Sequence, residues 1–167
     1  RVQRNSKLPP VGDVTGPAQA RLRIAVCTES IAREAAPEVR EQTLKTAGLN
    51  HHDLFSLLGV GLPADRLPMI LGCDGAGIDE DGNEVIVHAV VPSEGWHGDE
   101  TLDPRRSLLS ELHDGTLAEK VLVPTANLVP KPAGLDWHTA ACLSTAWLTA
   151  YRMLFSSAGL TPGATVL

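Results

Sequence analysis

The feature that most limits the fold of this chain is a change of hydrophobic pattern near residue 137. Before that point, short apolar segments of strand character alternate with turn residues, and the clearest are 84–91, 118–123 and 127–129. From 137 to 158, small and apolar residues recur at spacings of three and four, as on one face of a helix. Several short strands followed by one helix predict a β-rich α+β fold.

Turn residues punctuate these segments. Asp81-Gly-Asn83 predicts a hairpin turn before the strand at 84–91, and Gly159 is placed to end the helix. A second turn, Thr161-Pro-Gly163, leads into an expected last strand at 164–167. Residues 54–58 are expected to form a short helix or a turn.

The N-terminal part has a weaker pattern. Prolines and glycines in 1–20 predict an extended or disordered leader, and the alternation in 21–27 predicts a strand. The composition of 29–45 permits a helix, which Pro37 would interrupt. The chain begins at Arg1 and stops inside an apolar run, so we expect both ends to be cuts of a longer sequence.

Composition excludes several classes of function. The net charge of −6 argues against a nucleic-acid or anionic-membrane partner, because both favour a basic surface. No apolar run approaches the ~18–20 residues that span a bilayer, and the first residues do not form a secretory signal. Three widely spaced cysteines suggest a reducing compartment. We therefore expect a cytoplasmic protein whose partner is neither a nucleic acid nor a membrane.

Four stretches, in this order, carry a family resemblance. They are Ala47–Asp53, Leu71–Gly77, Gly115–Pro124 and the run from Leu128 to Gly163. Together they resemble the medium-chain dehydrogenase/reductase superfamily, most closely its quinone-oxidoreductase branch. The resemblance implies a GroES-like partial barrel at 21–135, then a linker helix and the first strand of a truncated Rossmann domain at 136–167. It implies an NAD- or NADP-dependent oxidoreductase, either a carbonyl, quinone or enone reductase or an alcohol dehydrogenase-like enzyme, that acts on a small-molecule substrate by hydride transfer. It also implies a possible homodimer through the missing domain.

The zinc positions of that superfamily are altered here. The resemblance places Asn50, Cys73 and Thr145 at the three catalytic ligand positions, and only Cys73 could bind as a thiolate. A rival zinc site would combine His51 or His52 with Cys73 and Asp74. The interval 91–112, where alcohol dehydrogenases carry a structural zinc lobe, contains no cysteine. The expectation is an enzyme without zinc.

Without a metal, hydrogen-bond donors must polarise the substrate. Asn50 and Thr145 are the candidate donors, and Thr145 and Thr149 are the candidate nicotinamide contacts. His52 is the candidate proton donor, with exposure in a loop as the alternative for it and for His51. Asp74 is either an acid–base group or a structural turn residue.

Four neighbouring residues receive structural interpretations. Asp53 is expected to cap a helix that begins at Leu54. Gly75 and Gly77 are expected to serve a tight turn rather than a phosphate loop. Cys142 is expected to point into packing.

One departure from the superfamily favours an alternative. Between Val39 and Leu44 the chain is too short for the proline-rich turn and full strand that the resemblance leads one to expect, and a missing strand would expose backbone edges. The alternative is therefore a truncated, catalytically inactive GroES-like remnant or binding module.

Overall fold

The computed structural model describes residues 39–166, and the expected leader, the strand at 21–27 and residues 29–38 lie outside them. The strands are β1 (Val39–Gly48), β2 (Asp74–Asp79), β3 (Glu84–Val87), β4 (Val90–Val91), β5 (Ser107–Leu108), β6 (Lys120–Pro124) and β7 (Leu128–Pro130). The α-helices are α1 (His51–Leu57), α2 (Trp137–Ala141) and α3 (Leu148–Tyr151). Single turns of 3₁₀ helix lie at Ala64–Arg66, Glu100–Leu102 and Thr125–Asn127. π-Helical turns at Leu143–Trp147 and Arg152–Ser157 flank α3.

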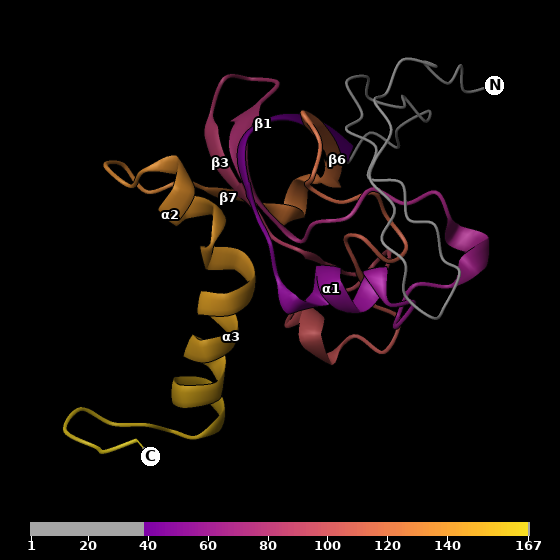
Figure 1. Cartoon of the computed structure of the whole chain (residues 1–167). Coiled ribbons are helices and arrows are strands. Elements are labelled where there is room, and N and C mark those ends of the chain that lie inside the picture. The colour runs from indigo at the N-terminus through magenta and orange to yellow at the C-terminus, as the bar shows by residue number, and fades with distance from the viewer. Residues whose placement is uncertain (1–38, 167) are drawn as a thin grey trace.

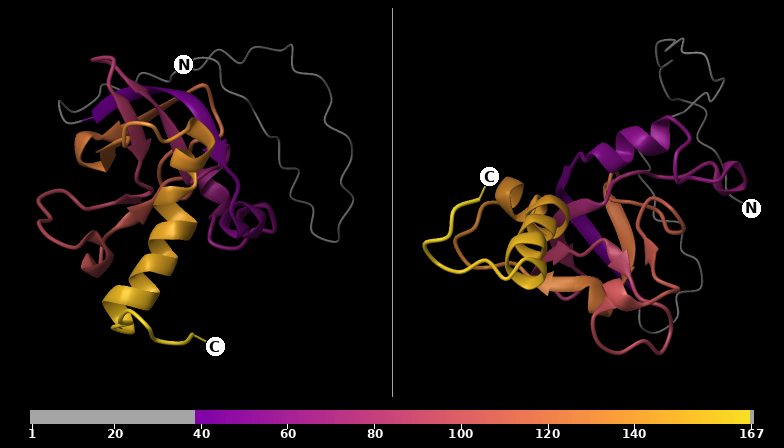
Figure 2. Two further views of the ribbon diagram at one scale, coloured as in Figure 1. Left: turned by 90° about the vertical axis from the view of Figure 1, so that its left-hand side faces the viewer. Right: turned by 90° about the horizontal axis from the view of Figure 1, so that it is seen from below.

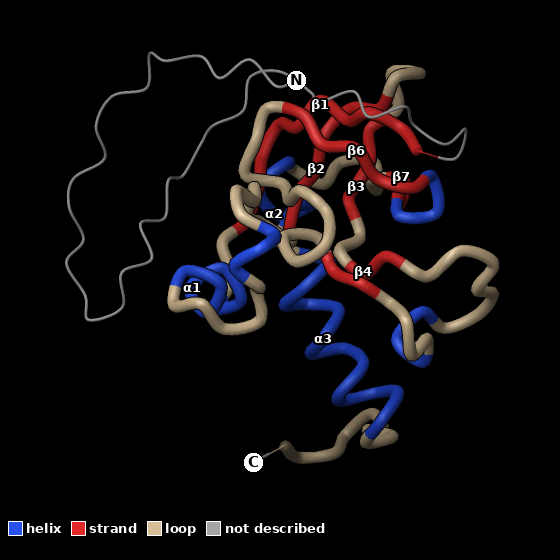
Figure 3. The backbone as a smooth tube through the Cα atoms, turned by 90° about the vertical axis from the view of Figure 1, so that its right-hand side faces the viewer, coloured by secondary structure: helices blue, strands red, loops and turns tan. Residues whose placement is uncertain are grey.

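The main sheet is antiparallel throughout, with the strand order β6-β1-β2-β3-β7 (Figures 1 and 3). A second, two-stranded sheet pairs β4 with β5. The hairpin turn predicted at 81–83 is confirmed, since it joins β2 to β3. The strands predicted at 118–123 and 127–129 are confirmed with shifted ends, as β6 and β7.

The prediction of a missing strand before Ala47 is wrong. Residues 39–48 form β1, the longest strand of the described chain, which pairs with β2 on one side and β6 on the other. A Cβ on Gly77 of β2 would lie 2.2 Å from the carbonyl oxygen of Thr43, so this glycine lets the two strands approach closely. Gly75 and Gly77 therefore serve strand packing within β2, and the expected tight turn is not there.

The strand predicted across 84–91 is interrupted, because β3 ends at Val87 and β4 begins at Val90 in the other sheet. Asn127 holds the break together: its side-chain amide donates to the carbonyl oxygens of His88 (2.8 Å) and Val90 (2.7 Å). The backbone carbonyl oxygen of Asn127 accepts the backbone N–H of His88 at 2.8 Å. The buried Asn127 side chain thus supplies hydrogen bonds that a neighbouring strand would otherwise supply. The backbone is therefore satisfied where the chain passes from one sheet to the other.

Two apolar clusters stabilise the domain. The first joins the two sheets through five buried residues: Val87, Val91, Leu109, Val121 and Val123. The second packs α2 against the main sheet, with Ala140 and Ala141 on Ala76 and Ile86. Small side chains on both faces allow the helix to lie close to the strands, and this contact anchors the C-terminal helical run.

The helical run from Trp137 to Ser157 is confirmed, apart from a turn at Cys142. It leaves the sheet at α2 and extends away from it (Figures 1 and 2). Gly159, with φ +63°, follows its end as predicted. Residues 164–166 form no strand, because a lone extended segment has no neighbour with which to pair. Cys142 is exposed, so its predicted packing role is wrong.

Candidate functional site

Three polar side chains meet where α1, β2 and the C-terminal helical run converge. The Asn50 side-chain N–H donates to Asp74 Oδ2 at 2.9 Å, and the Ser144 hydroxyl donates to Asp74 Oδ1 at 2.7 Å. Asp74 is 2% exposed. Two of the predicted site residues, Asn50 and Asp74, are therefore in direct contact, and Ser144 completes what we call the Asp74 junction.

Asn50 is held in place by the start of α1. It is the N-cap residue, in an extended conformation, and its backbone N–H donates to Asp53 Oδ2 at 2.8 Å. The other carboxylate oxygen of Asp53 accepts the Gly72 N–H at 2.9 Å. The helix begins at His51 and not at Leu54, so Asp53 acts from its third position, as in a capping box. Its buried carboxylate ties α1 to the loop before β2.

Asp74 is held equally firmly from its backbone side. Its carbonyl oxygen accepts the Thr116 hydroxyl at 2.6 Å. A Cβ on Gly48 would lie 3.0 Å from the Asp74 Cβ, so only glycine fits beside this side chain without a shift. The two stretches that resemble dehydrogenase motifs, around Asp74 and Thr116, thus meet in space. Nothing local in the sequence could reveal this pairing, because the residues are 42 positions apart.

Thr145 follows Ser144 in the same π-helical turn. Its hydroxyl oxygen is buried and has no hydrogen-bond partner among residues 39–166. A buried hydroxyl without a partner is costly, so a bound ligand is a natural partner for it. Thr149 lies one helical turn further along, in α3, and is exposed.

His52 is turned toward a different neighbour. Its Nε2 lies 3.7 Å from Glu111 Oε1, and this atom makes no hydrogen bond to any residue of the described chain. His51 is exposed and its ring stands 6.5 Å from that of Phe55. Both histidines lie on α1 and not in a loop, and neither has a recorded contact with the Asp74 junction.

Cys73 points away from its neighbour Asp74 into the core. Its Sγ lies 3.4 Å from both the Leu109 carbonyl oxygen and the Ser110 hydroxyl. Burial raises the pKa of this thiol to about 11, which disfavours the thiolate that zinc needs. Within residues 39–166 no three His, Cys, Asp or Glu side chains lie close enough together to hold a metal ion. The rival set of His51 or His52 with Cys73 and Asp74 is thus not assembled.

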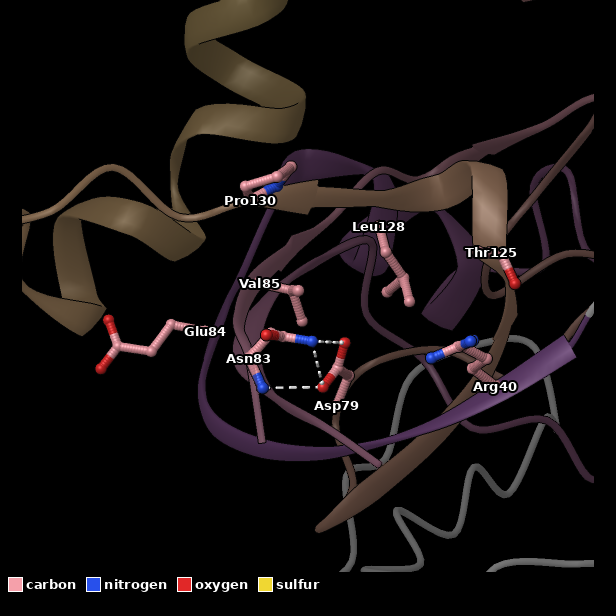
Figure 4. Close-up of a pocket in the computed structure, with 8 residues that line it drawn as sticks. All are labelled: Arg40, Asp79, Asn83, Glu84, Val85, Thr125, Leu128 and Pro130. Carbon is pink, nitrogen blue, oxygen red and sulfur yellow. Dashed lines mark hydrogen bonds between the residues drawn. The ribbon is translucent and has the colours of Figure 1, made fainter. Parts of the chain in front are cut away.

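A separate pocket opens at the hairpin end of the sheet (Figure 4). Arg40, Asp79 and Asn83 line its polar side, and Val85 and Leu128 its apolar side. The Asp79 carboxylate is already engaged, since it accepts the Asn83 backbone N–H at 2.8 Å and the Asn83 side-chain amide at 3.0 Å. None of the sequence-predicted site residues lines this pocket.

Ser144 and Glu111 are the polar neighbours that sequence reasoning missed. Ser144 lies 70 positions from Asp74, and a serine inside a helix carries no pattern that predicts such a contact. Glu111 precedes the motif-like stretch at 115–124 and follows Ser110, a buried residue at φ +68°. A left-handed conformation is uncommon for a residue other than glycine. No pattern in the sequence indicates it at Ser110, and only the folded backbone shows it.

Known proteins support the resemblance seen in the sequence, although no family model matches the chain. A solved NAD-dependent alcohol dehydrogenase is 33% identical with a TM-score of 0.71, over 81% of this chain and 44% of that one. Crotonyl-CoA reductase of Streptomyces avermitilis is 39% identical over 92 residues, which are 52% of this chain and 21% of the reductase.

A shorter match is to a protein of another class. The putative amidase AmiC of Mycobacterium tuberculosis is 67% identical over 49 residues, 29% of this chain and 10% of the amidase. The chain spans about a tenth of that protein's length, too little to carry any statement about amidase activity.

Two further observations complete the comparison. In the described part of the chain, every helix is too short or too polar to cross a bilayer. The β-rich partial barrel with its C-terminal helix agrees with the GroES-like domain expected from the sequence, and the alcohol dehydrogenase covers most of it. The chain therefore belongs to the medium-chain dehydrogenase/reductase superfamily, and its described residues form a GroES-like domain.

Proposed function

We propose that this chain is the substrate-side part of an NAD(P)-dependent oxidoreductase that interconverts a carbonyl, quinone or enone with its reduced form. We also propose that the GroES-like domain ends at residue 135 and that a linker helix then leads to a nucleotide-binding domain. The observation that carries it is the buried, unpartnered hydroxyl of Thr145 beside the Asp74 junction. The names of the dehydrogenase and reductase relatives support the same class.

A bound nicotinamide would supply or accept the hydride, and the residues of this chain would orient the partners. Asn50 has one N–H engaged by Asp74, which leaves the other to donate to a carbonyl oxygen. The Thr145 hydroxyl would donate to the substrate or to the nicotinamide, and Thr149 would flank the ring one helical turn away. These roles stay predictions.

His52 is the proposed proton donor. Its Nε2 is buried 3.7 Å from Glu111 Oε1 and makes no hydrogen bond to the described residues, so this nitrogen is not already committed to another partner. Asp74, by contrast, accepts two hydrogen bonds and fits an orienting role better than acid–base catalysis.

The reaction is proposed to proceed without zinc. Asn50 and Thr145 are neutral, weak ligands, and the Cys73 thiol faces the core. Elemental analysis of the purified protein is the test. Less than a tenth of an equivalent of zinc is expected, and one equivalent that is lost in Cys73→Ser would overturn the proposal.

The function itself is tested by titrating NADPH and NADH into the protein and following nicotinamide fluorescence. Thr145→Val removes the unpartnered hydroxyl and keeps its shape, and should weaken binding about tenfold through one lost hydrogen bond. Thr161→Val, at an exposed position, is the matched control and should bind as the parent does. Equal nicotinamide affinities of the Thr145 and Thr161 variants would show that the Thr145 hydroxyl does not contact the cofactor.

A binding module without catalytic activity is the second candidate, and one observation favours it. The C-terminal helical run exposes a set of large apolar side chains: Trp147, Leu148, Tyr151, Met153 and Phe155. Such a surface is typical of an interface. Failure of the protein to bind either nicotinamide, together with self-association that Tyr151→Glu abolishes in sedimentation, would favour this reading over the enzyme.

A further inference from the structure

The orientation of the Asn50 amide is decided by its neighbour. An ionised carboxylate only accepts hydrogen bonds, so the group that faces Asp74 Oδ2 at 2.9 Å must be the Asn50 nitrogen. The Asn50 carbonyl oxygen is thereby directed away from Asp74. The second N–H has no partner among residues 39–166, whereas the side-chain oxygen faces the backbone N–H of Asp53, as in a capping box. Asn50 is partly exposed.

The carboxylate that sets this orientation has little freedom of its own. Ser144 donates to its second oxygen at 2.7 Å, and the Thr116 hydroxyl holds the backbone carbonyl of the same residue. Gly48 stands close on the remaining side. Three separate parts of the fold therefore fix one carboxylate, which then fixes one amide.

Ser144 also links that amide to the other proposed donor. It precedes Thr145 in the same helical turn, so its bond to Asp74 connects the Thr145 backbone to the start of β2. A shift of the helical run would change the Ser144 contact, and through Asp74 it would change the direction of Asn50. The hydrogen bond between Ser144 and Asp74 therefore holds Asn50 and Thr145 in a fixed position relative to each other.

We infer that Ser144 and Asp74 are positioning residues that present the Asn50 amide to a single oxygen of the substrate. The free N–H can donate to a carbonyl oxygen, while the Asn50 oxygen faces the backbone N–H of Asp53 at the start of α1. With both ends of the amide held, the substrate oxygen meets a single donor of fixed direction. The inference rests on the proposed function for the identity of that substrate, and on the hydrogen bonds of Asn50 and Ser144 to Asp74 for the positioning.

The test measures the Asn50 side-chain amide directly by NMR. Asn50→Ala assigns its pair of proton signals, and their exchange with water is followed in Asp74→Asn and Ser144→Ala. Asp74→Asn loses a charge-assisted acceptor, so exchange should become about tenfold faster. Ser144→Ala should give a smaller increase, and Ser157→Ala, which removes an exposed serine of the same helical run, should leave exchange unchanged.

The outcomes separate positioning from function. Unchanged Asn50 exchange in Ser144→Ala and in a folded Asp74→Asn protein overturns the positioning role, whether or not a nicotinamide binds. If Asp74→Asn does not fold, the comparison of Ser144→Ala with Ser157→Ala decides alone. Faster exchange in a protein that binds neither NADPH nor a carbonyl ligand supports positioning and counts against the proposed function.

Discussion

Two buried polar side chains in the main sheet have opposite surroundings. Asp74, at the start of β2, is 2% exposed and accepts hydrogen bonds from Asn50 and Ser144. Gln42, in the middle of β1, is 0% exposed, and neither polar atom of its amide has a hydrogen-bond partner among residues 39–166. Burial costs free energy in both cases, but only Asp74 recovers it through its partners. The difference predicts that substitutions at Asp74 and at Gln42 change the stability of the domain in opposite directions.

The largest effect is expected from breaking that junction. Asp74→Ala leaves the Asn50 amide and the Ser144 hydroxyl without their acceptor, and should lower the free energy of unfolding by about 3 kcal/mol. Urea unfolding followed by circular dichroism measures it. Asp65→Ala, which alters an exposed aspartate with no recorded hydrogen bond, is the control and should be nearly neutral. A loss as small as that of the control would show that the junction contributes little to stability.

Gln42 should respond in the opposite direction. Gln42→Leu replaces an unpaired buried amide with an apolar side chain of similar size and should raise the free energy of unfolding by about 1 kcal/mol. Gln42→Glu places a charge in the same position and should destabilise the protein. If the leucine variant is instead less stable, the amide must have partners, such as ordered water.

The smallest effect is expected at an exposed ion pair, between Asp99 and the C-terminal helical run. Arg152 donates to Asp99 at 2.8 Å, and this contact, with the hydrogen bonds from Thr101, lowers the pKa of Asp99 to about 2. Because the folded pKa lies below the ordinary value of 3.8, the stabilisation is present above that value. It is lost as the pH falls toward about 2.

Asp99→Asn should therefore reduce the acid dependence of stability in this range, and Arg152→Gln should do the same. Thermal unfolding at a series of pH values from 5 to about 2 measures it. Identical pH profiles for the parent and both variants would show that the ion pair does not link protonation to folding.

Local pattern predicted much of this fold because each signal arises within a few residues. The Asp81–Asn83 turn, the helical run after Trp137 and the glycine that follows it all depend on neighbours in sequence. The expectation failed at β1, where Arg40, Glu41 and Lys45 give a polar composition. In the fold, Arg40 pairs with Asp81 and Glu41 pairs with Lys120, and these partners are 41 and 79 positions away in sequence. Such pairing cannot be seen in a single segment.

The candidate site shows the same division. Sequence resemblance led to Asn50, Asp74 and Thr145, but it could not supply Ser144 or the direction in which each side chain points. Asn50 was expected to be a free donor, whereas one of its N–H groups is engaged by Asp74. Cys73 and Asp74 are adjacent in sequence and face opposite ways, one to the core and the other to the junction.

The sequence by itself determined the β-rich class, the positions of the turns and the C-terminal helix, because backbone propensity and hydrophobic period are local properties. It also determined which residues stand at the motif positions of the superfamily. Only the tertiary structure decided that residues 39–48 are a central strand, that Ser144 reaches Asp74 and that Gln42 is buried with no partner in the described part of the chain. Those facts depend on contacts between residues tens of positions apart, and folding alone brings such residues together.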